Sequence, residues 1–135
     1  LNEAWSFRGD GYAQHAEKVL PSIKRFKVGG NRIGRGFEAA AATGDRGLGA
    51  KLELRRRLSA SFGMLGTGTA YSYYDLGAAW RNDQGGRESA ASAGLGLTFR
   101  GERWLSYLEA AKPLTHADAD DNKDVAVFFE MSFQF

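Results

Sequence analysis

The sequence predicts an all-β fold, specifically part of an antiparallel transmembrane β-barrel, on three observations. Apolar and polar residues alternate along several long segments, as in strands with two different faces. Glycine accounts for 18 of 135 residues and aromatic residues for 13%, a composition typical of barrels and sandwiches. No run comes near the roughly 20 apolar residues of a membrane-spanning helix, whereas barrel strands present only alternate residues to lipid.

The C-terminal segment shows the alternation most clearly. One face is wholly apolar and carries Val125, Val127, Phe129, Met131, Phe133 and Phe135. The other face carries Asp124, Ala126, Phe128, Glu130, Ser132 and Gln134. A strand with one apolar and one mainly polar face fits a wall between lipid and a wet lumen.

Four earlier segments repeat this pattern. In the first segment, Trp5 and Phe7 lie on the apolar face and Ser6, Arg8, Asp10 and Tyr12 on the opposite face. In the second, Leu48, Ala50, Leu52 and Leu54 lie opposite Lys51, Glu53, Arg55 and Arg57. In the third, Tyr74, Leu76 and Trp80 lie opposite Tyr71, Tyr73, Asp75 and Gly77, and in the fourth, Leu95, Leu97 and Phe99 lie opposite Gly94, Gly96, Thr98 and Arg100. A sixth strand is predicted from Trp104 to Lys112, with its facing left open. Most segments reach roughly 10 residues, which suits a tilted membrane strand better than a soluble strand of about 5 to 6.

Short and long connections alternate between the predicted strands. A long loop occupies about residues 16–47, and the later connections are 61–68, 82–88, Gly101-Glu102 and an acidic loop over 116–123. Membrane barrels have short periplasmic turns and longer outer loops, which places the C-terminus at the periplasmic end. Because eight strands is the usual minimum for closure, we expect residues 1–135 to be the C-terminal part of a longer barrel domain.

Charge and motif content argue against an enzyme or a nucleic-acid-binding protein. The net charge is +2, and the densest basic run, Arg55-Arg56-Arg57, is short. Cysteine is absent, and His15 and His116 have no partner at metal or catalytic spacing. The Gly29-x-x-x-x-Gly34 spacing lacks the Lys-Ser/Thr of a phosphate loop, and Asp118-x-Asp120-x-Asn122-x-Asp124 lacks the Gly and Glu of a calcium loop. We therefore expect no catalysis, no cofactor and no metal.

A series of short motifs resembles one protein family in order and spacing. The motifs are Leu20-Pro21, Phe26 through Arg35-Gly36-Phe37, Gly44-Asp45-Arg46-Gly47, Lys51-Leu52-Glu53-Leu54, Tyr73-Tyr74-Asp75-Leu76-Gly77, Gly94-Leu95-Gly96-Leu97, Ala111-Lys112-Pro113-Leu114 and the terminal Phe129 to Phe135. Together they resemble the TpsB transporters of two-partner secretion, the hemolysin secretion/activation proteins (ShlB/FhaC/HecB) of the BamA-like superfamily. The chain departs from that family's Val/Ile-Arg-Gly-Phe/Tyr loop motif by placing Gly34 between Ile33 and Arg35.

The resemblance implies a set of site residues. Arg35, Gly36 and Phe37 would form the tip of a loop folded into the lumen, where Arg35 would meet Asp75 on the wall. The residues implied to lie on the same wall around the loop are Tyr73, Gly77, Gly94 and Gly96, with Gly94 and Gly96 leaving room for it. The terminal residues implied to form the signal read by the barrel-assembly machinery are Phe129, Met131, Phe133 and Phe135. The alternation independently turns Asp75 inward, because it shares parity with Tyr73 and Gly77.

The resemblance also implies the function and location. The six strands would be about strands 11–16 of a 16-stranded barrel in the Gram-negative outer membrane. The expected function is translocation of a secreted polypeptide cargo of the hemolysin or adhesin type. Outer-membrane lipid and the barrel-assembly machinery are further expected partners, and nucleic acid is not. Two alternatives stay open: a barrel-assembly-type insertase, and a soluble β-barrel that binds a small ligand and folds without detergent.

Overall fold

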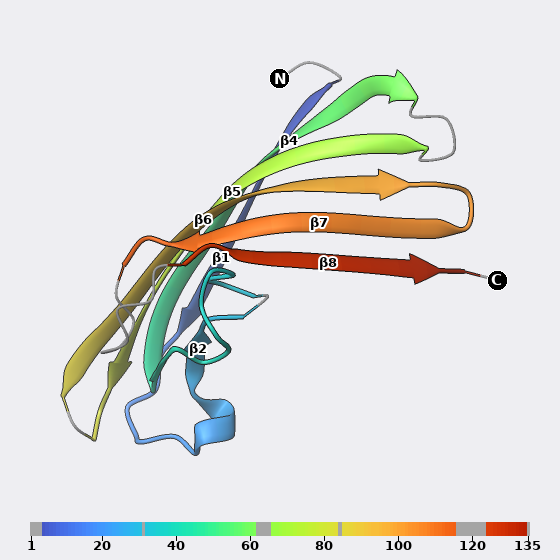
Figure 1. Cartoon of the computed structure of the whole chain (residues 1–135). Coiled ribbons are helices and arrows are strands. Elements are labelled where there is room, and N and C mark those ends of the chain that lie inside the picture. Colours follow the sequence, from blue (N-terminus) through green and yellow to red (C-terminus); the bar gives the residue numbers. More distant parts are fainter. Residues whose placement is uncertain (1–3, 31, 62–65, 84, 116–123, 135) are drawn as a thin grey trace.

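The computed structural model describes residues 4–30, 32–61, 66–83, 85–115 and 124–134. Its main element is a curved sheet of six antiparallel strands (Figure 1). In sheet order these strands are β1 (Trp5–Gln14), β4 (Arg46–Ser61), β5 (Thr67–Arg81), β6 (Gly86–Arg100), β7 (Trp104–Pro113) and β8 (Ala126–Phe133). The predicted all-β antiparallel architecture is confirmed, and each predicted strand corresponds to one strand of this sheet. Among the described strands, β1 and β8 form opposite edges and do not pair with each other.

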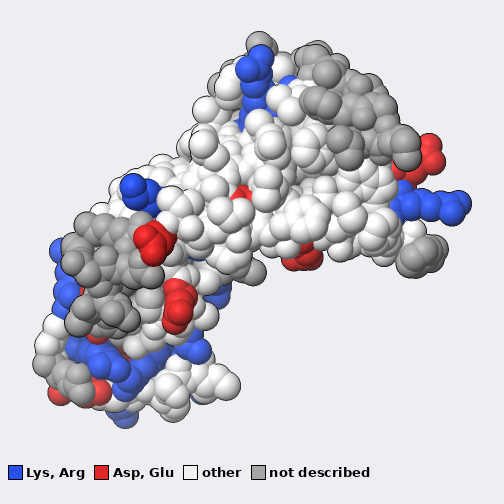
Figure 2. All heavy atoms as spheres, in the orientation of Figure 1, with Lys and Arg blue, Asp and Glu red and all other residues white. Residues whose placement is uncertain are grey.

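The two faces of the sheet differ in chemistry. On one face, called the outer face here, large apolar side chains are open to the surroundings; Phe7 is 59% exposed, Leu95 67% and Phe129 66%. On the opposite, inner face, Glu53, Tyr73 and Asp75 are buried. This arrangement reverses the pattern of a soluble sheet, whose apolar face is the covered one. Most charged side chains visible in Figure 2 gather towards the two ends of the molecule, and the stretch between carries few.

The register settles the facing of β7, which the sequence left open. Glu109 of β7 lies opposite Gly96 of β6 on one side and Phe128 of β8 on the other. Glu109 is therefore an inner-face residue, while its neighbour Leu108 lies opposite Leu97 and Phe129 on the outer face.

The long connection between β1 and β4 folds back over the inner face (Figure 1). It spans residues 15–45, and its described residues form one 3₁₀ turn, η1 (Ser22–Lys24), and a small hairpin of β2 (Phe26–Val28) and β3 (Ala42–Gly44). These short elements were not predicted, because three residues are too few to show a period. No helix in the described residues has the length and apolar character needed to cross a membrane.

The main apolar cluster lies between this loop and the inner face. Its buried members are Val28, Ile33, Ala42 and Ala90, and Phe26 and Phe37 pack against it. Glycines on the wall receive the loop's side chains: Val28 lies over Gly77, Ile33 over Gly49 and Phe26 over Gly47. Because a methyl group at any of these glycines would meet the loop side chain, the wall is shaped to hold the loop closely.

Gly94 and Gly96 make room for a different group from the one expected. The space above Gly94 holds the ring of Tyr73, and the space above Gly96 holds the ring of Tyr71. The physical reason is the register, which places Tyr73 directly opposite Gly94 and Tyr71 directly opposite Gly96. The glycines therefore serve the loop indirectly, by letting two tyrosine rings lie flat against the wall.

We predict that Gly94→Ala destabilises the sheet, because the new methyl group would lie 2.5 Å from the Ala110 carbonyl oxygen and would also displace the Tyr73 ring. Overpacking of this kind costs about 1–3 kcal/mol of the free energy of unfolding. Gly86→Ala, on the same strand, is the control because its methyl group meets nothing within 4 Å. Thermal unfolding of the full-length protein in detergent should show a lower midpoint for Gly94→Ala alone, and equal midpoints would contradict the packing described.

Candidate functional site

The tip of the long loop is built by glycines in left-handed backbone conformations. Gly29, Gly30 and Gly34 have φ of 111°, 79° and 81°, values that residues with a side chain rarely adopt. Two hydrogen bonds close the turn. The Gly29 amide donates to the Ile33 carbonyl at 2.7 Å, and the Phe37 amide donates to the Gly34 carbonyl at 3.0 Å. The unexpected Gly34 therefore provides a turn that directs Arg35 towards the wall.

The carboxylate of Asp75 on β5 accepts hydrogen bonds from both the backbone and the side chain of the loop tip. The backbone amides of Gly34 and Arg35 both donate to its Oδ2 atom at 3.2 Å. The Arg35 side chain adds a fork, with Nε at 3.0 Å from Oδ2 and Nη2 at 3.2 Å from Oδ1. A bidentate pair of this kind fixes the orientation of the guanidinium as well as its position. The predicted contact between Arg35 and Asp75 is thus present in the structure.

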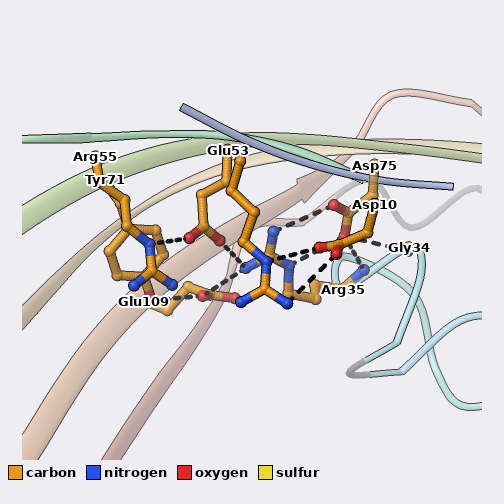
Figure 3. A network of polar contacts seen from close by, with 9 residues as sticks. Asp10, Gly34, Arg35, Glu53, Arg55, Tyr71, Asp75 and Glu109 are labelled. Atoms are coloured by element: carbon orange, nitrogen blue, oxygen red, sulfur yellow. Dashed lines mark hydrogen bonds and ion pairs between the residues drawn. The ribbon is translucent and has the colours of Figure 1, made fainter. Parts of the chain in front are cut away.

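Two more carboxylates approach the same guanidinium from two other strands of the sheet (Figure 3). Nη1 of Arg35 lies 3.3 Å from Glu53 Oε2 on β4 and 3.4 Å from Glu109 Oε2 on β7. The Tyr73 ring stacks on the guanidinium, with Cζ of Arg35 3.4 Å from the ring centroid. A planar cation is therefore bounded by acids from three strands and by one aromatic face.

The acids around Arg35 are themselves held in place. The Tyr71 hydroxyl donates to Glu109 Oε2 at 2.7 Å, and Arg55 forms an ion pair with the other oxygen of Glu53. Three carboxylates thus face two guanidinium groups, and Arg35 is the deeper of the two cations, with its side chain 11% exposed. Removing Arg35 would leave this part of the inner face with excess negative charge in a largely enclosed space.

Gly36 and Phe37 complete the tip. A Cβ atom on Gly36 would lie 2.9 Å from Ser92 Cβ and 3.0 Å from backbone atoms of Lys112 and Pro113. Only glycine allows the backbone to come this close to β6 and β7. Phe37 packs against the apolar cluster beneath the loop. The three tip residues therefore make distinct contacts: Arg35 with the acids, Gly36 with the wall backbone and Phe37 with the apolar cluster.

The structure brings most of the predicted site residues together and adds others. Asp75 and Tyr73 contact Arg35 directly, and Gly77 lies under Val28 of the same loop. The residues not predicted as site residues are Glu53, Glu109 and Tyr71. The alternation already placed Glu53 on the inner face, but its contact with Arg35 depends on the path of the loop.

The remaining candidate residues lie elsewhere. Phe129, Met131 and Phe133 lie on the outer face of β8, whereas Phe135 and the acidic stretch 116–123 fall outside the described residues. Within the described ranges, no group of three or more His, Cys, Asp or Glu side chains could hold a metal ion.

A sheet with an apolar outer face, and a polar inner face covered by its own loop, is the architecture of an outer-membrane β-protein. The chain belongs to the haemolysin secretion/activation protein family ShlB/FhaC/HecB, whose model matches residues 1–99. Members of this family are outer-membrane transporters of the TpsB type and not enzymes, and the family implies a secreted TpsA partner. No curated protein and no solved structure matches the chain. The matched region includes the loop, its tip and Asp75.

We predict that Gly36→Ala weakens docking of the loop tip, because backbone atoms of β7 cannot move aside to admit a methyl group. Overpacking of about 1–3 kcal/mol should raise trypsin cleavage after Arg35 about tenfold in the folded full-length protein. Gly11→Ala on β1 is the control, since its methyl group meets nothing within 4 Å. Cleavage after Arg35 at the parent rate in Gly36→Ala would contradict this account of the tip.

Proposed function

We propose that the chain forms about strands 11–16 of a 16-stranded outer-membrane barrel, as the C-terminal part of its barrel domain. This barrel translocates a secreted partner protein of the hemolysin or adhesin type. Within it, Arg35 acts as a latch that holds the loop tip on the lumen wall. The observation that carries the proposal is the fork of Arg35 on the fully buried Asp75, reinforced by Glu53 and Glu109.

The chemistry of the latch suits a contact that must both hold and release. Exposed ion pairs contribute about 0–1 kcal/mol, and breaking a fully buried pair by removing one partner costs about 3–5 kcal/mol. Arg35 lies between these limits, because its side chain is mostly covered yet faces a polar surface. Water can replace the protein partners of each charged group when the tip leaves, so release needs no covalent change.

Membership of the secretion/activation family favours a transporter over a barrel-assembly insertase. The outer-membrane location of that family also argues against the soluble ligand-binding alternative. The inner face supports the same conclusion, because the chain's own loop packs on it through the apolar cluster and the Arg35–Asp75 pair. The loop would have to move before a polypeptide could pass.

We propose that the outer face of β8 serves as the signal for the barrel-assembly machinery. Phe129, Met131 and Phe133 form an apolar row on the terminal strand, and each is at least 43% exposed. Support comes from the position of β8 at the edge of the described sheet, where its free side is open to pair with another strand.

We predict that Arg35→Ala reduces secretion of the partner protein and increases spontaneous channel opening in planar bilayers. Asp75→Ala should have a smaller effect of the same kind, because Glu53 and Glu109 still contact the guanidinium. In thermal unfolding, the double variant should lose less free energy of unfolding than the two single variants lose together. The difference, the coupling energy, should be about 0.5–3 kcal/mol.

The controls for this prediction come from a second ion pair on the inner face. Arg8 and Asp10 of β1 are joined at 2.9 Å without contacting Arg35, and the Arg8 side chain is 64% exposed. Arg8→Ala and Asp10→Ala should therefore leave secretion and channel opening at parent levels. Parent-level secretion and opening in both Arg35→Ala and Asp75→Ala would overturn the latch.

A further inference from the structure

The motif Gly44-Asp45-Arg46-Gly47 has no part in the latch, yet it contains one of the most completely buried carboxylates of the chain. Asp45 has no exposed surface and lies between β3 and the start of β4, where the long loop rejoins the sheet. A buried charge is costly unless donors surround it. Its donors come from segments far apart in the sequence.

Asp45 receives backbone hydrogen bonds from two separate segments. The Leu20 amide, in the outgoing arm of the loop, donates to Oδ1 at 2.7 Å. The Asn82 amide, in the turn between β5 and β6, donates to Oδ2 at 2.8 Å. Arg25 adds its Nε atom at 3.5 Å from Oδ1. One carboxylate thus joins the outgoing arm to the β5–β6 turn at the point where the returning arm ends.

Side chains around Asp45 reinforce the same junction. Nδ2 of Asn82 donates to the Ala16 carbonyl at 2.9 Å, and Arg25 reaches Asp83 at 3.4 Å. The amide of Asp45 itself donates to the Trp80 carbonyl at 2.8 Å. Gly44 permits this approach, because a Cβ atom there would lie 2.5 Å from the same Trp80 oxygen. We call this junction of residues 16–25, 44–45 and 80–83 the root of the loop.

We propose that Asp45 is a positioning residue that fastens the root of the loop to the sheet independently of the latch. The tip then leaves the wall as a hinged finger whose root stays in place. Only the statement that the tip leaves during transport rests on the proposed function. The fastening itself rests on the contacts of Asp45, which share no residue with the contacts of Arg35.

The two attachments are built from different segments of the chain. At the tip, the buried carboxylate of Asp75 accepts two amides of the tip itself at 3.2 Å, and Arg35 adds ion pairs with three carboxylates. At the root, the buried carboxylate of Asp45 accepts amides of two separate segments, from Leu20 in the loop at 2.7 Å and from Asn82 in the β5–β6 turn at 2.8 Å. The root can therefore stay fastened when the contacts of Arg35 are lost.

Distances between spin labels can test the two attachments separately in the full-length protein, because the described chain has no cysteine to interfere. Val19 is an exposed site in the outgoing arm, Glu38 is an exposed site near the tip, and Gly86 is an open position at the start of β6. The pair Val19→Cys with Gly86→Cys reports on the root. The pair Glu38→Cys with Gly86→Cys reports on the tip.

We predict that Asp45→Asn broadens the distance distribution of the root pair, because asparagine keeps one accepting oxygen and replaces the other with an NH₂ group, which cannot accept the second backbone amide. Loss of one such hydrogen bond should raise the population of detached roots about tenfold. Arg35→Ala should broaden the tip pair while the root pair stays narrow. Asp83→Asn is the matched control, since it removes an exposed carboxylate beside Arg25 and leaves both amide bonds to Asp45.

Two outcomes would overturn the proposal. One is an unchanged root pair in Asp45→Asn, and the other is a root pair that broadens together with the tip pair in Arg35→Ala. Asp45→Ala is measured in parallel, with circular dichroism confirming that the sheet is retained in each variant. If secretion is normal in Arg35→Ala while the root and tip pairs still respond separately, the latch fails as a transport element and the fastening stands.

Acid should release the root in a defined range. Hydrogen bonds from the Asn82 and Leu20 amides hold the pKa of Asp45 below its usual range, and the positive charges of Arg25 and Arg81 act in the same direction. Since the folded-state pKa is lowered, the stabilisation is complete above the usual aspartate pKa of about 3.9 and is lost as pH falls through the lowered value. We predict a narrow root pair at pH 5 that broadens only below about pH 4, and broadening already at pH 5 would contradict the charge-dependent fastening.

Discussion

A carboxylate without exposed surface, Asp75 on the inner face of the sheet, determines how the long loop must lie. The pleat of β5 turns Asp75 inward, and its cross-strand neighbours are Lys51 and Ser92. A buried carboxylate needs several donors, and the loop supplies two amides and a forked guanidinium from Gly34 and Arg35. To deliver them together, the backbone must turn at Gly34 and press Gly36 against β6 and β7. The position of one acid therefore accounts for the glycines at the tip.

The same constraint explains why the apolar cluster lies under the loop. In this sheet the apolar outer face is left for lipid, so it cannot provide an internal core. The loop carries its own apolar residues, Val28 and Ile33, to the inner face and buries them on glycines of β4 and β5. Burial of those two side chains contributes roughly 1.5–3 kcal/mol each. The ionic contacts fix where the tip sits, and the apolar contacts supply much of the attraction.

Strand positions and facing were largely predictable from sequence, whereas the full set of contacts to Arg35 was not. Period-2 alternation is a local signal, and by itself it assigns Asp75 and Glu53 to the inner face. Glu109 was missed because the facing of its segment, which mixes apolar residues on both sides, was left open; the register with Gly96 and Phe128 settles it. Gly34 stood out as a departure from the family motif, but its role depends on a positive φ and on the position of its amide over Asp75. Contacts between a loop and four strands depend on the three-dimensional path of the chain, which no short pattern encodes.

The loop joins the sheet through two separate attachments, and this separation bears on how a plugged barrel can open. Release of the tip would free the carboxylate of Asp75, the amides of Gly34 and Arg35, and the ion pairs of Arg35. Release of the root would free a different carboxylate, Asp45, and the amides of Leu20 and Asn82. Because the two sets of contacts share no residue, loss of one set leaves the other in place. With the root held beside Asn82, a released tip would stay within the reach of the loop, and reclosure would need only a local search over the inner face.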